Sequence, residues 1–77
     1  MHGLKLVADV LREVLARCEG RRVEAVRLKV GENCHARPHD IEYLFREAAR
    51  GTKAEAARLE IDSTSGEELV LESIRVE

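Results

Sequence analysis

The chain has 77 residues, of which 44% are apolar and 36% charged, and its formal net charge is −2. This length allows one domain with one small core, so residues 1–77 are expected to form a single module. Lys and Arg are interleaved with Asp and Glu, which argues against a nucleic-acid-binding surface. No apolar run approaches the ~20 residues of a membrane span. Two cysteines are too few for a disulfide framework, which indicates a reduced, cytoplasmic protein.

Residues 3–19 are predicted to form the first helix. Apolar residues recur there at steps of three and four positions, and Gly20 is a typical residue to end a helix. Cys18 lies on the apolar stripe, so it is expected to be a small buried side chain and not a reactive thiol. The residues that define the stripe are Leu4, Val7, Leu11, Val14 and Cys18.

Residues 22–30 alternate between apolar and charged side chains, which predicts a strand that ends at Gly31. A second helix is predicted to begin at Pro38, because proline suits the first helical position, and to stop at Gly51. Its N-cap would be Arg37, whose side chain has no acceptor for the free N–H groups of a helix start.

Two further strands are predicted at residues 57–62 and 69–76. In the last of them the apolar positions change parity between Leu71 and Ile74. A bulge near Glu72 and Ser73 would return all the apolar side chains to one face of the sheet.

The predicted order is helix, strand, helix, strand, strand, with residues 63–68 as a turn or loop. This order favours an α+β fold in two layers, a three-stranded sheet with both helices on one face. The side chains expected to be buried together are Leu11, Val14, Val26, Leu28, Leu44, Phe45, Leu59, Ile61 and Leu71.

Three potential metal ligands, Cys34, His35 and His39, lie in the loop GENCHARPHD at residues 31–40. A zinc site of the structural kind needs four ligands, and the sequence supplies no fourth protein ligand at a suitable spacing. A solvated loop is therefore the favoured interpretation. No catalytic constellation is visible in the sequence, so the protein is not expected to be an enzyme.

Several stretches together resemble the HypA/HybF family of hydrogenase and urease nickel-incorporation proteins. They are the initial MH, the strand end VRLKVGE, the aromatic pair in YLF, the segment RGTKAEAARLEI and the final SGEELVLESIRVE. The similarity runs from Met1 to about Ile61 and resumes at Ser65–Glu77. It implies a nickel metallochaperone that delivers Ni(II) during maturation of a metalloenzyme such as hydrogenase.

The resemblance also implies a nickel site at the amino terminus, formed by the terminal amine, the His2 side chain and neighbouring backbone nitrogens. An all-nitrogen, square-planar set suits Ni(II). Met1 and His2 match the family at these positions. Gly3 stands where the family usually has Glu, and Arg37 where it tends to have Asp, so two carboxylates near the implied site are missing.

Family members insert a zinc domain built on two CxxC pairs between the last two strands. Here this insertion is reduced to a turn at about residues 62–67, and no CxxC occurs, so no structural zinc is expected. An alternative role for the loop then arises, in which Cys34, His35 and His39 fold back near His2 and provide a second metal-handling surface.

The partners implied by the resemblance are a nickel accessory GTPase and the hydrogenase large subunit. No nucleic-acid or membrane partner is expected. The alternative function is an interaction or regulatory module that kept the fold and lost the metal role.

Overall fold

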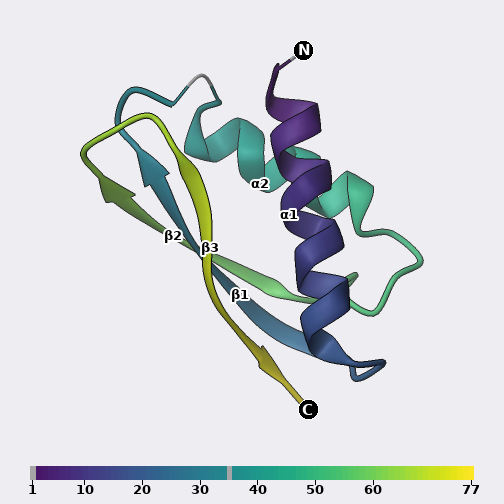
Figure 1. Cartoon of the computed structure of the whole chain (residues 1–77). Helices are drawn as coiled ribbons and strands as arrows, with labels where there is room; N and C mark the ends of the chain where they lie inside the picture. Colours follow the sequence, from purple (N-terminus) through teal and green to yellow (C-terminus); the bar gives the residue numbers. More distant parts are fainter. Residues whose placement is uncertain (1, 35) are drawn as a thin grey trace.

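The structure is a computed structural model, and it describes residues 2–34 and 36–77, apart from the side chain of His2. It contains α1 (His2–Cys18), β1 (Val23–Gly31), α2 (Pro38–Ala48), β2 (Arg58–Thr64) and β3 (Leu69–Val76). Both helices lie on one face of the sheet, and the termini lie at opposite ends of the molecule (Figure 1). The predicted α+β fold, with its two layers and its order of elements, is confirmed.

β1 is the central strand of the sheet, whose order is β2-β1-β3. It pairs in parallel with β2 and antiparallel with β3. The parallel pair requires a crossover, and α2 supplies it, as in a βαβ unit. β1 is therefore the strand around which the other elements are arranged.

The bulge predicted in the last strand is confirmed at Glu72. Arg27 lies opposite Ser73 and the next residue, Leu28, lies opposite Leu71, so Glu72 is the extra residue of β3. A second irregularity makes Glu24 the extra residue on β1. These two insertions keep apolar side chains on the helix-facing side along the whole β1–β3 ladder.

The connection from β2 to β3 crosses over the end of β1, because β1 lies between those two strands. Gly31 lies directly beneath the crossing. A Cβ atom at this position would overlap the carbonyl oxygen of Gly66 and would lie 2.5 Å from its carbonyl carbon. The Gly31 N–H donates to the Glu68 carbonyl at 2.9 Å, and the Asn33 N–H donates to the Gly66 carbonyl at 2.9 Å. Only glycine permits this close approach of two backbones.

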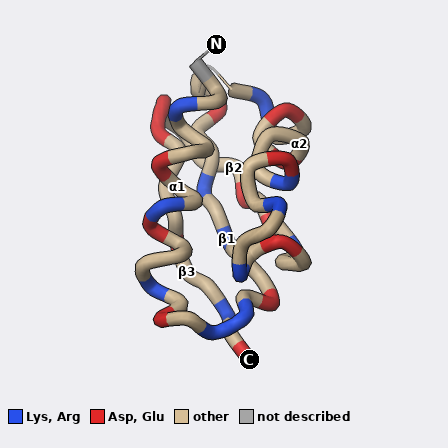
Figure 2. The backbone as a smooth tube through the Cα atoms, turned by 90° about the vertical axis from the view of Figure 1, so that its right-hand side faces the viewer, with Lys and Arg blue, Asp and Glu red and all other residues tan. Residues whose placement is uncertain are grey.

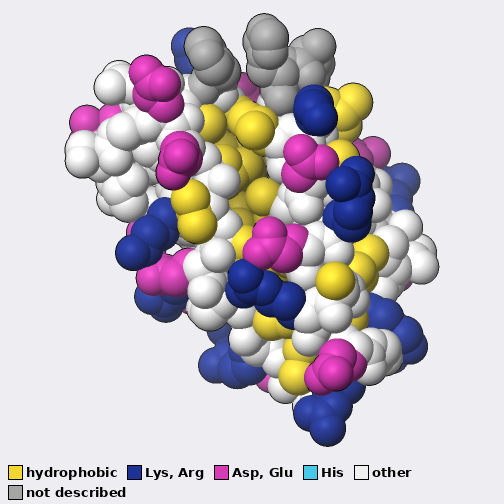
Figure 3. Space-filling view, viewed as in Figure 1, with side chains coloured by type: hydrophobic (Ala, Val, Ile, Leu, Met, Phe, Trp, Pro, Cys, Tyr) yellow, Lys and Arg dark blue, Asp and Glu magenta, His cyan; other side chains and the backbone are white. Residues whose placement is uncertain are grey.

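The core fills the space between the helices and the sheet, and part of it is visible as an apolar strip between α1 and β3 (Figure 3). Cys18 is 2% exposed and belongs to this core, as predicted. The largest fully buried side chains of the core are Phe45, Leu28, Ile41, Val7, Val14, Val23, Val26 and Val30.

Three residues of the predicted core, Leu44, Leu59 and Ile61, are only partly buried, so the prediction that they are core residues was wrong. Leu59 and Ile61 lie on β2, an edge strand that has β1 on one side only. An edge side chain lacks neighbours on its outer flank and so stays partly in contact with solvent.

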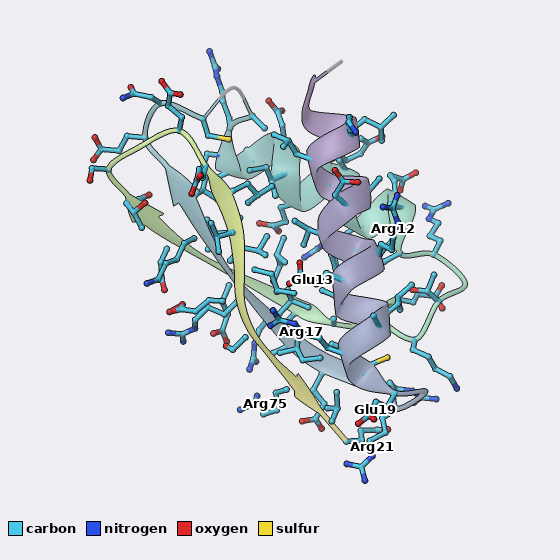
Figure 4. The ribbon with its side chains drawn as sticks, viewed as in Figure 1. Arg12, Glu13, Arg17, Glu19, Arg21 and Arg75 are labelled. Carbon is cyan, nitrogen blue, oxygen red and sulfur yellow. The ribbon has the colours of Figure 1, made fainter. Side chains whose placement is uncertain are left out.

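Positions of Lys and Arg are interleaved with positions of Asp and Glu along the backbone of both helices and the sheet (Figure 2). Arg17 and Glu13 form an ion pair of 2.6 Å, one turn apart, on the side of α1 that faces β3, while Arg12 points to the other side (Figure 4). None of the helices among the described residues is both long enough and apolar enough to cross a membrane.

Candidate functional site

The start of α1 packs against the loop that connects β1 with α2. Gly3 is buried, and a Cβ atom placed on it would lie 3.3 Å from Leu44 Cδ1 and 3.4 Å from Ala36 Cβ. These separations leave little room for a side chain at this position. The backbone beside the amino terminus is therefore held against α2 and the loop, which places the two candidate metal regions at the same end of the molecule.

The predicted ligands are described only in part. Met1, the side chain of His2 and His35 lie outside the described residues. Gly3, whose backbone nitrogen belongs to the predicted nickel set, is described and lies near the start of α1. Its burial gives a physical reason for glycine at this position, because a longer side chain would meet Leu44 and Ala36.

The described part of the loop cluster does not form a metal site. Cys34 is partly buried against the core, and its N–H donates to the Gly31 carbonyl at 3.0 Å. His39 is exposed in the first turn of α2. Among residues 3–34 and 36–77, no group of three or more His, Cys, Asp or Glu side chains is placed to hold a metal ion.

The helix that follows the loop begins without a side-chain cap, as the sequence indicated. Arg37 is the N-cap in extended conformation and its side chain makes no capping hydrogen bond, while Pro38 occupies the first turn. The Arg37 carbonyl accepts the first helical bond from the Ile41 N–H at 2.9 Å. Asp40 lies in the first turn of α2, where a carboxylate is favoured by the helix dipole.

The segment RGTKAEA forms a compact turn whose role was not recognised from the sequence. The Thr52 hydroxyl donates to the Ala49 carbonyl at 2.6 Å and accepts from the Ala54 N–H at 3.1 Å. The Lys53 carbonyl accepts from the N–H of Val23 at 2.9 Å, which attaches the turn to the start of β1. A threonine two residues before a buried alanine, just after a helix-ending glycine, was the available signal.

The sheet face turned away from the helices carries an ionic cluster centred on Arg27. Its guanidinium donates to Glu60 at 2.9 Å and lies 3.7 Å from Asp62. The hydrogen bond from Arg27 lowers the pKa of the Glu60 carboxyl, and the same bond raises the pKa of Arg27. Both side chains are substantially exposed, so this cluster is a solvated surface feature and not a buried catalytic pair.

The described residues form a small α+β domain in which Gly3 packs against the loop that carries Cys34 and against α2. Residues 1–69 match the family described as "Hydrogenase/urease nickel incorporation, metallochaperone, hypA". The chain belongs to the HypA family. It is thus a member of a family of metallochaperones, which are maturation factors and not enzymes.

Similar proteins include the hydrogenase maturation factors HypA of Geobacter sulfurreducens and Methylocella silvestris. The first is 38% identical over 66 residues, which are 86% of this chain and 60% of that protein. The second is 39% identical over 72 residues, 87% of this chain and 62% of that protein. The HypA of Archaeoglobus fulgidus is 36% identical over 64 residues, and this match covers 58% of that protein. The chain thus spans about three fifths of the length of these relatives.

Proposed function

We propose that this protein binds Ni(II) at its amino terminus, through Met1, His2 and Gly3, and delivers it during maturation of a metalloenzyme such as hydrogenase. The observation that carries the proposal is the match to the nickel-incorporation family, which begins at residue 1 and so includes these three positions. The ligands would be the terminal amine of Met1, the imidazole of His2 and backbone nitrogens of His2 and Gly3. Nickel is here a cargo that is bound and passed on.

The start of α1 supports this chemistry. The helix begins at His2, and the first four N–H groups of a helix have no acceptor within it. Two backbone nitrogens from this turn could therefore lose their protons to a metal without breaking a helical hydrogen bond. Their negative charge would also offset the unfavourable effect of the positive helix end on a cation.

The packing of Gly3 supports a defined geometry for the site. Because Gly3 lies against Ala36 and Leu44, the backbone of the first turn is held in place on one side. Ligands on a fixed backbone lose less conformational entropy when they bind a metal than ligands on a free chain end.

Calorimetric titration with Ni(II) tests the proposal on a chain whose free amino terminus is Met1. We expect one tight site, which His2→Ala abolishes and which a residue added before Met1 also abolishes. The matched control is Cys34→Ser combined with His35→Ala and His39→Ala, which should leave the affinity within about threefold of the original. Loss of binding in the loop variant with an unaffected His2→Ala variant would refute the proposal and assign the metal to the loop cluster.

We further propose that residues 1–77 form a single module in which the turn between β2 and β3, at about residues 62–67, takes the place of the family's zinc domain. The backbone hydrogen bonds between this turn and the end of β1 support a closed connection that needs no additional ligand. No structural zinc is expected in such a module, and a cytoplasmic location agrees with its two free cysteines.

The partners proposed from the family resemblance are a nickel accessory GTPase and the hydrogenase large subunit. The alternative function is an interaction module without a metal role, which the absence of the family's carboxylates at Gly3 and Arg37 and the loss of the zinc domain would favour. Absence of Ni(II) uptake by the chain with a free Met1 amine would support this alternative.

A further inference from the structure

Three shallow hollows adjoin on the surface around Ala56, with volumes of about 680, 560 and 330 Å³. Ala56 lines all three, and each pair of hollows shares a further residue, which is Glu55, Arg22 or Arg58. The hollows therefore form one continuous depression, which we call the Ala56 groove and define by the residues that line them. It is bordered by the turn at residues 51–57, the last turn of α2 and the starts of β1 and β2.

The Ala56 groove is basic although the whole chain is acidic. It contains six of the 13 Lys and Arg residues but only three of the 15 Asp and Glu residues, so it carries a formal charge of +3 and the rest of the chain −5. Its basic residues are Arg22, Arg46, Arg50, Lys53, Arg58 and Arg75, and its acidic residues are Glu24, Glu47 and Glu55. Folding brings these basic residues together from separate segments, so the interleaving of charges along the sequence does not reveal them.

The cationic groups of the groove are available to a ligand. Four of its arginines form ion pairs of 3.2–3.5 Å with glutamates, and all four side chains are largely exposed; they are Arg46, Arg50, Arg58 and Arg75. Ion pairs between exposed side chains contribute little free energy, so these guanidinium groups can accept other carboxylates. Arg22 and Lys53 form no ion pair with any residue that the structure describes.

The backbone beneath these two residues is held in place. The N–H of Val23, the residue after Arg22, donates to the carbonyl of Lys53 at 2.9 Å. The Thr52 hydroxyl bonds to Ala49 and Ala54 on either side. Arg22 and Lys53 therefore keep their places relative to each other, which lowers the entropic cost of binding a ligand between them.

The composition of the groove favours an acidic peptide over other anionic partners. Glu55 lies in the groove, where it would repel the phosphates of a nucleic acid but can accept the N–H groups of a peptide. The two aromatic residues of the chain, Tyr43 and Phe45, do not line the groove, so it offers no surface for base stacking. The exposed large apolar side chains of the described residues, Leu4, Tyr43 and Val70, also lie outside it, so it has no anchor for a membrane.

We propose that the Ala56 groove binds an extended acidic segment of a partner protein. Carboxylates of that segment would pair with Arg22, Lys53 and the neighbouring guanidinium groups, whose paired N–H donors match the two oxygens of a carboxylate. Arg75 lies at the end of the molecule opposite the amino terminus (Figure 4), so a bound partner would leave the amino terminus free. The proposal does not depend on whether nickel binds there.

The first test is fluorescence anisotropy with a labelled eight-residue peptide that alternates glutamate and alanine. The unaltered chain should bind it, and the same peptide with glutamine in place of glutamate should bind at least about tenfold more weakly. Arg22→Glu combined with Lys53→Glu should also weaken binding of the acidic peptide by more than about tenfold. The matched control is Lys5→Glu combined with Arg12→Glu on α1, near Asp9, which changes the net charge equally and should leave the affinity within about threefold. Equal losses in the two variants would overturn the proposal, because net charge alone would then explain the binding.

The second test is an NMR titration of the unaltered chain with the same peptide, which does not depend on whether any variant folds. The amide signals of Gly51, Lys53 and Ala56 should shift, while those of Lys5 and Asp9 should stay in place. No shift at about 1 mM peptide would overturn the proposal. So would tighter binding of an oligothymidylate or of phosphatidylserine vesicles than of the peptide, since the groove would then belong to a nucleic acid or a lipid surface.

Discussion

Replacing Gly31 by alanine should destabilise the protein although alanine is ordinarily tolerated in a strand. The added methyl group would overlap the Gly66 carbonyl oxygen, lie 2.5 Å from its carbon and lie 2.8 Å from the Glu67 nitrogen. All three atoms belong to the backbone, so no side-chain rotation can relieve the overlap. Overpacking of this kind costs about 1–3 kcal/mol. For a domain of this size, a loss of about 2 kcal/mol corresponds to a fall in Tm of about 8–16 °C.

Thermal unfolding followed by circular dichroism measures this effect, and hydrogen exchange locates it. The amides of Gly31 and Asn33 donate to the crossing at 2.9 Å each, so both should exchange faster in Gly31→Ala. Gly51→Ala is the matched control, because Gly51 has φ +77 and nothing within 4 Å of an added Cβ. It should cost about 1–2 kcal/mol through its left-handed backbone alone and leave those two amides unaffected. A Gly31→Ala protein with the original Tm would show that the crossing does not press on β1.

Three further changes test the core, the turn and the ionic cluster. Leu28→Ala should lower the free energy of unfolding in urea by about 2–5 kcal/mol, because Leu28 is fully buried. Leu59→Ala should lower it by less than half as much, and equal losses for the two variants would contradict the edge position of β2. Thr52→Val should lower the free energy of unfolding by about 1–2 kcal/mol, because two hydrogen bonds are lost. Thr64→Val should leave it nearly unchanged, because the hydrogen bond of the Thr64 hydroxyl is exposed. Similar losses for both variants would show that the Thr52 hydrogen bonds do not stabilise the turn. The pKa of Glu60 is lowered by its hydrogen bond from Arg27, the residue opposite it on β1. This pair therefore stabilises the fold fully at pH values above the ordinary pKa of a glutamate. The stabilisation is lost as the pH falls through the pKa of Glu60 in the folded protein. Glu60→Gln should therefore lower the urea midpoint at neutral pH and match the original protein in strong acid, and a difference that persists in acid would assign the effect to packing.

The elements of the fold could be predicted because each is encoded locally. Periodicity and helix-ending glycines indicate the helices, and the change of parity between Leu71 and Ile74 is sufficient to predict the bulge at Glu72. The order of the strands is not a local property. Without it, Leu59 and Ile61 could not be recognised as edge residues, and they were assigned to the core on hydrophobicity alone.

The candidate site could be predicted only from the resemblance to the family. A terminal amine and one histidine form a ligand set that almost any chain beginning Met-His possesses, so spacing alone carries little information about it. The close packing of Gly3 against Ala36 and Leu44 depends on how α1 approaches α2, and no pattern in the sequence encodes that approach. For the loop cluster, the absence of a fourth protein ligand in the sequence predicts that no structural zinc site forms, and this stays a prediction.

The central position of β1 has a consequence for synthesis of the protein on the ribosome. β1 is translated before β3, yet β3 is the strand that pairs with the side of β1 turned away from β2. A nascent chain that has released α1, β1, α2 and β2 can form the parallel pair but leaves the other side of β1 without its partner strand. The sheet cannot be completed cotranslationally until β3 has emerged from the exit tunnel, and until then the exposed side of β1 is available to chaperones.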